Sequence, residues 1–315
     1  MATRAEIERH YDTMGVLHVL AMKDVQGDYP DYSCAFFDGD FNKSYVQAQA
    51  DKHAWIFDGL DLGQDLQGKR VLDIGCGWGP MLNATRKRGG HGVGLTLSSG
   101  QAEYCQKRGL DVRLRDYKTL SAGELGIFDG IVSLGAFEHF CSVEDLLASK
   151  QGEVYRNFFR ICAEHLPPDG RLYLQTMTWG KQVPDYRTLS LDAPPDSMEA
   201  ILARILYLFP GSWLPNGLTQ LIECASEHFD FISSNNGRLD YLQTITLWGQ
   251  ATPNLWKLNA LPRTLRHAIP WLLKVLTDHD ASVQFQSRRR RDMNACFARE
   301  IMSHERIFFV KKSRQ

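Results

Sequence analysis

The sequence has almost no net charge and no cysteine pattern that would hold a metal or a disulfide framework. Its 36 Lys and Arg residues nearly balance 37 Asp and Glu residues, for a net charge of −1. No overall field therefore favours nucleic acid as a partner. The seven cysteines are scattered, odd in number and without a Cys-x-x-Cys pair. This argues against a zinc site or disulfides, predicts no bound metal, and indicates a reducing compartment.

The chain also lacks long apolar runs, internal repeats and low-complexity segments. No stretch has the length of a transmembrane helix, and the charged start of the chain has no apolar core of a signal peptide. We therefore expect a cytoplasmic protein that at most touches a membrane surface. The 315 residues suffice for one large domain or two small ones, and 11% aromatic residues would suit an enzyme that handles apolar ligands.

Apolar segments alternate with helical patterns from residue 71 to about residue 177. The alternation predicts a doubly wound, mostly parallel α/β sheet with its ligand at the carboxyl ends of the strands. Helical patterns, such as those at 99–108 and 154–165, fill the gaps between strands. The expected strands are Val71–Gly75, His91–Leu97, Val112–Asp116, Phe128–Leu134 and Arg171–Met177, with Arg306–Lys311 as a last strand.

Four regions follow from this pattern. We expect an N-terminal helical lid at 1–60, an α/β core at 61–178, a helical insertion at 179–240, and C-terminal helices with the last strand at 241–315. Within the insertion, apolar residues recur at helical spacing, which predicts a helix; they are Met198, Ile201, Leu202, Ile205 and Leu206. Several apolar groups follow in loop context, which favours a cap that covers an apolar substrate channel.

The most informative stretch is Val71–Gly79, an apolar run that ends in Asp73 and then three alternate glycines. Such a turn lets a ligand lie against bare backbone at the start of the next helix. The dinucleotide fingerprint would need a glycine at position 80, which is Pro80, and an acid about 20 residues on, which is absent. The glycines instead resemble the S-adenosylmethionine (SAM) loop of methyltransferases, where an ammonium group suits Asp73. A turn without a ligand is the alternative.

A second candidate lies at the exit of the fourth predicted strand. Glu138 falls where a doubly wound sheet opens its crevice, among apolar neighbours, and a carboxylate there is costly unless it is paired or used. A helix-capping or salt-bridged acid is the alternative. His139 fits an orienting or structural role better than a catalytic one. Cys34, in an aromatic turn, taken alone fits a small buried apolar residue.

Blocks along nearly the whole chain, in order, resemble the cyclopropane fatty acid and mycolic acid cyclopropane synthases. The block from Ile131 to Phe140 is rather specific to that group, whereas the glycine turn is shared by methyltransferases at large. The other blocks are Tyr32–Phe37, Leu72–Gly79, Gly94–Ser98 with Gln101, Phe209–Gly211 with Leu214–Pro215, Glu223–Ala225, and Tyr241 with Thr244, Leu247 and Trp248.

The resemblance implies a class I methyltransferase fold with a seven-stranded sheet and a pocket for SAM. The cofactor residues carried over are Tyr32, Ser33, Asp73, Gly75, Gly77, Gly79, Thr96, Leu97 and Gln101, with Asp116 and Tyr117 beside the adenine. The family also holds a bicarbonate ion, thought to act as a base, with a Cys, a Glu, a His and a Tyr. Cys34, Glu138 and Tyr241 match three of these. Gln175 stands where the family has this histidine. Asp240 precedes Tyr241 at a position where relatives usually carry a further histidine.

The implied function is SAM-dependent methyl transfer to a double bond of a lipid-like substrate through a carbocation. Ring closure needs a base, and neutral glutamine cannot titrate, so ring formation and methyl branching both stay open. Aromatic faces from Tyr32, Phe137, Trp179 or Trp213 could stabilise the cation. The alternatives are N-methylation of a small amine, with Glu138 beside the ammonium, and a SAM-binding partner protein without catalysis.

The strongest charge run is Arg288–Arg291. It predicts either a solvated helix face or a contact with an anionic headgroup or an acyl carrier. The expected partner is therefore an apolar, alkene-containing small molecule or lipid, with peripheral membrane contact as an option. The oligomeric state is not readable from the sequence.

Overall fold

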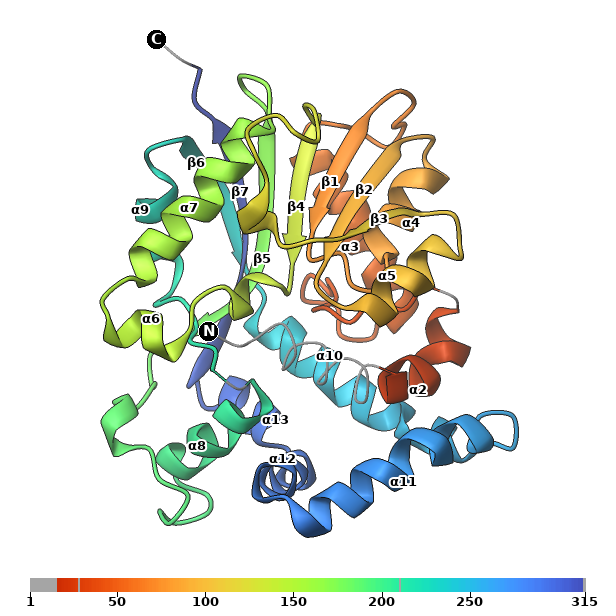
Figure 1. Cartoon of the computed structure of the whole chain (residues 1–315), viewed down its shortest axis with the longest axis vertical. Helices are drawn as coiled ribbons and strands as arrows, with labels where there is room; N and C mark the ends of the chain where they lie inside the picture. The colour runs from red at the N-terminus through yellow and green to blue at the C-terminus, as the bar shows by residue number, and fades with distance from the viewer. Residues whose placement is uncertain (1–15, 28, 210, 314–315) are drawn as a thin grey trace.

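The computed structural model describes residues 16–27, 29–209 and 211–313, and a seven-stranded sheet forms its centre (Figure 1). The strand order is β3-β2-β1-β4-β5-β7-β6. β7 runs antiparallel to both of its neighbours, and the other paired strands are parallel. The predicted doubly wound, mostly parallel sheet is confirmed. The strands are β1 (Arg70–Ile74), β2 (His91–Thr96), β3 (Asp111–Leu114), β4 (Gly130–Leu134), β5 (Arg171–Trp179), β6 (Phe229–Asn236) and β7 (Met302–Lys311).

Helices cover both faces of the sheet, so its central strands are buried on both sides. On one face, the aromatic side of α7 packs against β1, β4 and β5 through Phe158 and Phe159. On the other, α3 places Ile56 and Phe57 against Val132. The elements around the sheet are α2 (Val16–Gln26), α3 (Tyr45–Gly59), α4 (Pro80–Lys87), α5 (Ser99–Gln106), η2 (Tyr117–Thr119), η3 (Phe137–His139), α6 (Val143–Leu147), α7 (Gln151–Glu164), η4 (Tyr186–Thr188) and α9 (Leu218–Ala225).

A second group of helices lies together beyond one end of the sheet (Figure 1). It consists of α8 (Met198–Leu208), α10 (Arg238–Ala251), η5 (Thr252–Trp256), α11 (Leu261–Thr277), α12 (His279–Arg290) and α13 (Asp292–Ala298). The helix predicted from Met198 onward is α8. It packs on α12 and α13, and the buried ion pair of Arg204 with Asp292 (Nε to Oδ2, 2.7 Å) ties it to α13.

The insertion is shorter than the predicted range 179–240. The later part of that range forms α9, which packs on α7, and β6, which is an edge strand of the central sheet. β6 escaped prediction because most of its residues are polar and exposed, so it lacks the alternation of a half-buried strand. In the predicted lid, residues 1–15 lie outside the described part of the chain. Among the described residues, no helix is both long and apolar enough to cross a membrane.

Candidate functional site

A cavity of about 740 Å³ opens where β1, β2 and β4 end. The turn after β1, the loop after β2 and the loop after β4 line it, as expected for the carboxyl edge of a doubly wound sheet. The structure brings ten of the predicted cofactor residues into its wall; these are Tyr32, Ser33, Asp73, Gly75, Gly77, Thr96, Leu97, Gln101, Asp116 and Tyr117. We call this space the cofactor cavity.

Gly75 lets the backbone after β1 pass directly under the loop after β4. Its φ is +88°, and a Cβ there would lie 2.2 Å from the Cβ of Ala136. Gly77 also has a positive φ, with open space beside it. Gly79 is different, because it does not line the cavity. It caps α4, and a Cβ on it would lie 2.6 Å from Cδ1 of Leu110. Of the three glycines predicted to border the ligand, Gly75 and Gly77 therefore line the cavity, whereas Gly79 packs closely against Leu110 outside it.

Several polar atoms in the cavity wall are buried without a partner. Asp73 Oδ1, Trp78 Nε1 and the Tyr117 hydroxyl make no hydrogen bond within the described chain. Burial, together with the nearby charge of Asp31, raises the pKa of Asp73 to about 8. Unpartnered buried groups are costly unless a ligand satisfies them. The donor and acceptor set fits a ligand that brings an ammonium group to Asp73, as SAM does.

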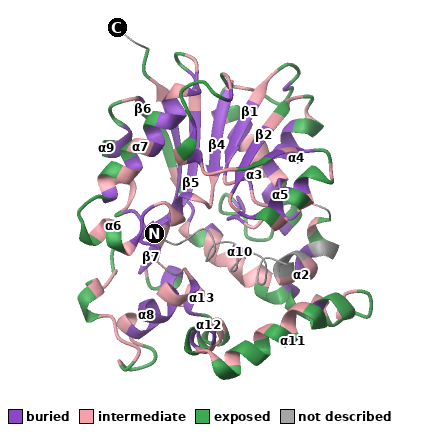
Figure 2. Cartoon of the chain, viewed as in Figure 1, coloured by how far each residue is buried: buried purple, intermediate pink, exposed green. Residues whose placement is uncertain are grey.

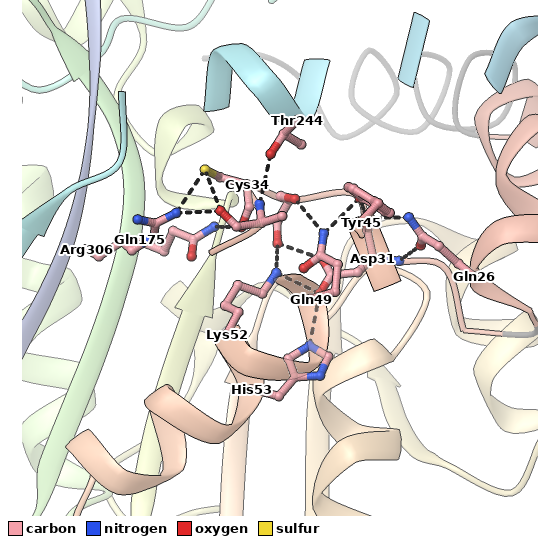
Figure 3. Close-up of polar contacts among 12 residues, drawn as sticks. Gln26, Asp31, Cys34, Tyr45, Gln49, Lys52, His53, Gln175, Thr244 and Arg306 are labelled. Carbon is pink, nitrogen blue, oxygen red and sulfur yellow. Dashed lines mark hydrogen bonds and ion pairs between the residues drawn. The ribbon is translucent and has the colours of Figure 1, made fainter. Parts of the chain in front are cut away.

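The segment from Asp31 to Ala35 forms another part of the wall and is held between α3 and α10 (Figure 3). From α3, Lys52 Nζ donates to Asp31 Oδ2 and to Ser33 Oγ, both at 2.7 Å. From α10, Thr244 Oγ1 accepts the Ala35 N–H at 3.0 Å. Contacts from both sides fix Tyr32 and Ser33 at the cavity.

Asp31 is the acidic residue of this segment, and its carboxylate is held by several partners. Burial would raise its pKa, but the positive charge of Lys52 and the contact with His53 (Nε2 to Oδ2, 3.0 Å) outweigh burial and hold the pKa well below its usual range. Ser33 Oγ donates to the second carboxylate oxygen at 2.6 Å. Asp31 is therefore ionised and immobilised in the wall of the cofactor cavity.

Two further elements orient polar groups along the wall. Thr96 Oγ1 donates to Gln101 Oε1 at 2.9 Å, which fixes the amide of Gln101 at the start of α5. Asp116 Oδ1 accepts the Lys118 N–H at 2.9 Å and so caps η2. Tyr117 packs against Phe140 and Phe158.

Glu138 lies in η3, directly after the loop of Gly135 and Ala136 that meets the glycine turn. Its Oε1 accepts the Met177 N–H at 3.0 Å, whereas its Oε2 is buried without a partner. Burial raises the pKa of Glu138 to about 7, although its hydrogen bonds with the backbone and Thr176 oppose the shift. A Cβ on Gly135 would lie 4.0 Å from Oε1 and 3.9 Å from the Cβ of Ser33. The acid therefore lies beside the cavity wall, where it can exchange a proton near neutral pH.

His139 also faces the cofactor cavity, and its Nδ1 lies 3.2 Å from Ser212 Oγ. Burial lowers the pKa of His139 to about 4. The ring is therefore neutral at pH 7, which agrees better with orientation than with proton donation.

The other predicted catalytic residues, Cys34 and Gln175, lie in a second buried group, which we call the arginine cluster. Its centre is Arg306 of β7, which faces Gln175 of β5 in the register of the sheet. Arg306 Nη1 donates to Asp240 Oδ2 at 2.8 Å. Its Nη2 donates to Cys34 Sγ at 3.2 Å (Figure 3). The members of the arginine cluster are Cys34, Gln175, Asn235, Asp240 and Arg306.

Tyr241 borders this cluster through the backbone. It follows Asp240 at the start of α10, and its ring packs against Phe297 and His304 at centroid distances of 4.8 and 5.1 Å. The arginine cluster therefore reaches the start of α10. Glu138 is not a member of it, but its contact with β5 is at Met177, two residues after Gln175.

The arginine cluster does not fit a bicarbonate ion. The Cys34 thiol already contacts Arg306 and the carbonyls of Ala35 and Gly237, and burial raises its pKa to about 11. Gln175 Nε2 donates to the Cys34 carbonyl at 3.3 Å, and its Oε1 accepts the Tyr173 hydroxyl at 2.9 Å. Asp240 pairs with Arg306 at 2.8 Å, so the net charge of the cluster is already balanced, although Arg306 Nε is buried without a partner. We therefore derive no chemical step through bicarbonate.

Two further expectations need correction. Phe137 is not an aromatic face for a cation, because it is fully buried against Phe140, Tyr155 and Phe158 in the sheet core. The arginine run is not one uniform surface either. The side chain of Arg288 turns inward and hydrogen-bonds Tyr32, and burial lowers its pKa.

Sequence reasoning also missed Lys52 and Arg306. Both are fully buried. For Arg306 a signal existed, since it stands with His304 and Glu305 just before the apolar run 307–310, and charges in a strand paired on both sides need partners. For Lys52 the sequence gives no comparable signal.

The glycine turn, the unpartnered Asp73 and the cavity at the carboxyl ends of β1, β2 and β4 define a SAM-dependent methyltransferase of class I. The family model for mycolic acid cyclopropane synthetase matches residues 1–261. The chain is 32% identical over 253 residues to cyclopropane mycolic acid synthase 1 of Mycobacterium tuberculosis, covering 78% of this chain and 81% of that protein. It is 32% identical over 237 residues to cyclopropane mycolic acid synthase 2 of Mycobacterium leprae, covering 70% and 71%.

A solved structure gives the same assignment. Mycolic acid cyclopropane synthase CmaA1 complexed with SAH and CTAB superposes with a TM-score of 0.70 at 25% identity, covering 98% of both chains. The chain therefore belongs to the mycolic acid cyclopropane synthetase family, and it is a SAM-dependent, cyclopropane synthase-like methyltransferase.

Proposed function

We propose that this protein transfers a methyl group from SAM to a double bond in an unsaturated lipid chain, and that Glu138 accepts the proton released afterwards. The observation that carries the proposal is the free Oε2 of Glu138, buried beside the cofactor cavity on a carboxyl whose pKa is raised to about 7. A general base works best with a pKa near the working pH.

The residues of the cavity would hold SAM by its charged and polar ends. Asp73 would take the ammonium group, the bare backbone at Gly75 and Gly77 would allow close approach, and Asp116 and Tyr117 would border the adenine. Bound there, SAM supplies an electrophilic methyl group. The chain's own part is to orient the ligand and to exclude water from the alkene.

Methyl addition to an alkene leaves a positive charge on the neighbouring carbon, and the cation must then lose a proton. Ionised Glu138 would stabilise that charge and take the proton on Oε2. Loss of a proton from the new methyl group closes a cyclopropane ring, whereas loss from the adjacent chain carbon leaves a methyl-branched alkene. Neutral His139 does not compete as an acid. Tyr32, which stacks on Trp248 at a centroid distance of 4.6 Å, offers an aromatic face nearby.

The proposal is tested with SAM deuterated in its methyl group, incubated with the protein and an unsaturated phospholipid, and in parallel with the same chain on an acyl carrier. Mass spectrometry of the product decides the outcome. Ring closure leaves two of the three deuterium atoms, and branching leaves all three. Label in a panel of small amines but in no lipid would overturn the proposal in favour of N-methylation.

Glu138→Gln is the matched variant, since it keeps the shape and the Met177 contact. We expect a loss of activity of about 100- to 10,000-fold, with unchanged binding of the demethylated cofactor. In the unaltered protein, activity should rise with pH and level off above about pH 7, because only the ionised carboxyl accepts a proton. Full activity in the variant would contradict the role of Glu138 and would favour a different base.

A further inference from the structure

The most unusual surface of the molecule is one side of α11. Five apolar side chains, at i, i+4, i+7, i+8 and i+11, share one stripe of this helix, and all are exposed; they are Leu265, Ile269, Leu272, Leu273 and Leu276. Leu273 is 60% exposed and Leu276 is 81% exposed. Figure 2 shows α11 exposed over most of its length. Folded domains rarely leave a contiguous apolar surface of this kind without a partner.

This stripe is not the side that holds α11 in the fold. The helix packs on α12 through a different side, where the Trp271 ring lies 5.7 Å from that of Phe285, and it contacts α2 and η5. Two apolar residues shortly before the helix are also exposed, Trp256 at 65% and Leu258 at 92%. One apolar side of α11 therefore packs against the rest of the protein, and a second apolar side faces outward.

The charged side chains of α11 have one sign, and Arg266 lies beside the stripe while Arg263 and Lys274 lie on the other side of the helix. α11 contains Arg263, Arg266 and Lys274 and no acidic residue, although Lys274 pairs with Asp278 at its end (Nζ to Oδ2, 3.5 Å). A helix with an exposed apolar stripe, basic residues on its polar side and an exposed tryptophan shortly before it matches an anionic lipid surface in both polarity and charge. A second protein chain would need no such bias toward basic residues.

We propose that α11, with Trp256 and Leu258, docks the protein on an anionic lipid bilayer, with the leucine stripe among the acyl chains and the basic residues at the headgroups. The family model match ends at residue 261, where α11 begins, so the leucine stripe lies beyond that match, whereas Trp256 and Leu258 lie within it. The proposal does not rest on the proposed function, although a surface-bound enzyme would meet a lipid chain directly.

The test measures sedimentation of the full-length protein with phosphatidylglycerol vesicles and with phosphatidylcholine vesicles, with no SAM present. We expect binding to phosphatidylglycerol that weakens as salt is raised. The double variant Leu273→Gln with Leu276→Gln should bind about 100-fold more weakly, because two leucine side chains lose their burial. Glutamine is nearly as good a helix former as leucine, so the helix itself is kept.

Two controls separate the contributions. Ile127→Gln alters an isoleucine that is 48% exposed just before β4, far from α11 in the sequence, and should bind as the unaltered protein does. Arg263→Gln with Arg266→Gln should weaken binding to phosphatidylglycerol by about 10-fold and leave binding to phosphatidylcholine unchanged.

Two results would overturn the proposal. One is vesicle binding by the leucine variant equal to that of the unaltered protein. The other is no vesicle binding at all, with self-association by analytical ultracentrifugation that the leucine variant abolishes, since the stripe would then join two copies of the chain. Failure of methyl transfer with intact vesicle binding would contradict only the proposed function.

Discussion

The cofactor cavity and the arginine cluster are both buried, and both contain paired carboxylates, but only the cavity and its border also hold carboxyl oxygens without a partner. In the cavity wall, Asp73 Oδ1 lacks a partner, and so does Oε2 of the neighbouring Glu138. In the cluster, the Asp240 carboxylate is paired with Arg306 at 2.8 Å, and Arg306 also contacts Cys34, Ala35 and Asn235. Burial alone therefore does not identify the site of chemistry.

This difference between the two regions indicates where a ligand binds. Carboxyl oxygens that are buried without partners raise the free energy of the folded chain, and a ligand can recover that energy. In the arginine cluster the Asp240 carboxylate is paired, and the buried atom left without a partner is a donor, Arg306 Nε, rather than a carboxyl oxygen. The side chains of Cys34 and Gln175, which match or replace family bicarbonate residues, have partners within the protein, whereas Asp73 Oδ1 and Glu138 Oε2 have none.

The largest expected effect is on stability, and it comes from a substitution in the arginine cluster. Arg306→Met would leave the Asp240 carboxylate buried and unpaired, and should lower the free energy of unfolding by about 3–5 kcal/mol. The double variant Arg306→Met with Asp240→Leu should recover most of this loss, because no unpaired charge remains. Urea denaturation measures both variants. If the single variant were as stable as the unaltered protein but failed to bind SAM, the arginine cluster would have to be part of the ligand site.

The glycine turn offers the next effect. Gly75→Ala places a Cβ 2.2 Å from that of Ala136 at a φ of +88°, and should cost about 2–4 kcal/mol of stability together with most of the SAM affinity. Gly63→Ala is the control, since Gly63 has a similar φ of +68° and no atom within 4 Å of the added carbon. Its cost should be about 1 kcal/mol, with SAM binding by calorimetry unchanged. Equal losses in both variants would mean that the contact with Ala136 is unimportant.

Local patterns predicted the glycine turn and Glu138 because strand, turn and acid follow one another in the sequence. Local spacing could not tell that Gly79 faces Leu110 while Gly75 and Gly77 line the cavity. β6 was missed because an exposed edge strand needs no apolar alternation.

The arginine cluster could not be predicted for a different reason. The contact of Arg306 with Asp240 joins positions 66 residues apart, and that with Cys34 joins positions 272 apart. Only the fold brings them together, through the pairing of β7 beside β5. The substitution of Gln175 for a family histidine was visible in the sequence, but the guanidinium opposite it was not.

A third experiment concerns the proton on Asp73. With a pKa of about 8, this carboxyl is about nine-tenths protonated at pH 7 without ligand. Because an ammonium group stabilises the ionised form, SAM binding should release about one proton. Calorimetry in two buffers of different ionisation enthalpy measures this number. Asp73→Asn should abolish the release and weaken SAM binding by about 10- to 100-fold. Proton release that persists in the variant would assign it to another group.

The same pKa fixes how stability depends on pH. The folded protein holds this proton more tightly than the unfolded chain, whose carboxyl has a pKa near 4. Stability from this group should therefore fall as pH rises from about 4 to about 8 and change little beyond. Asp73→Asn should flatten that part of the curve, whereas a substitution in the arginine cluster should not.

The smallest effect lies at the junction of the two regions, where Thr244 accepts the Ala35 N–H at 3.0 Å, directly after Ser33 of the cavity and Cys34 of the cluster. Thr244→Val keeps the shape but leaves a buried N–H unpaired, which should cost about 1–2 kcal/mol of stability. Because the wall segment loosens, SAM should also bind several-fold more weakly. Thr244→Ser retains the hydroxyl and should bind SAM normally by calorimetry. Equal SAM affinity in the valine variant would show that α3 alone, through Lys52, holds Ser33 in place.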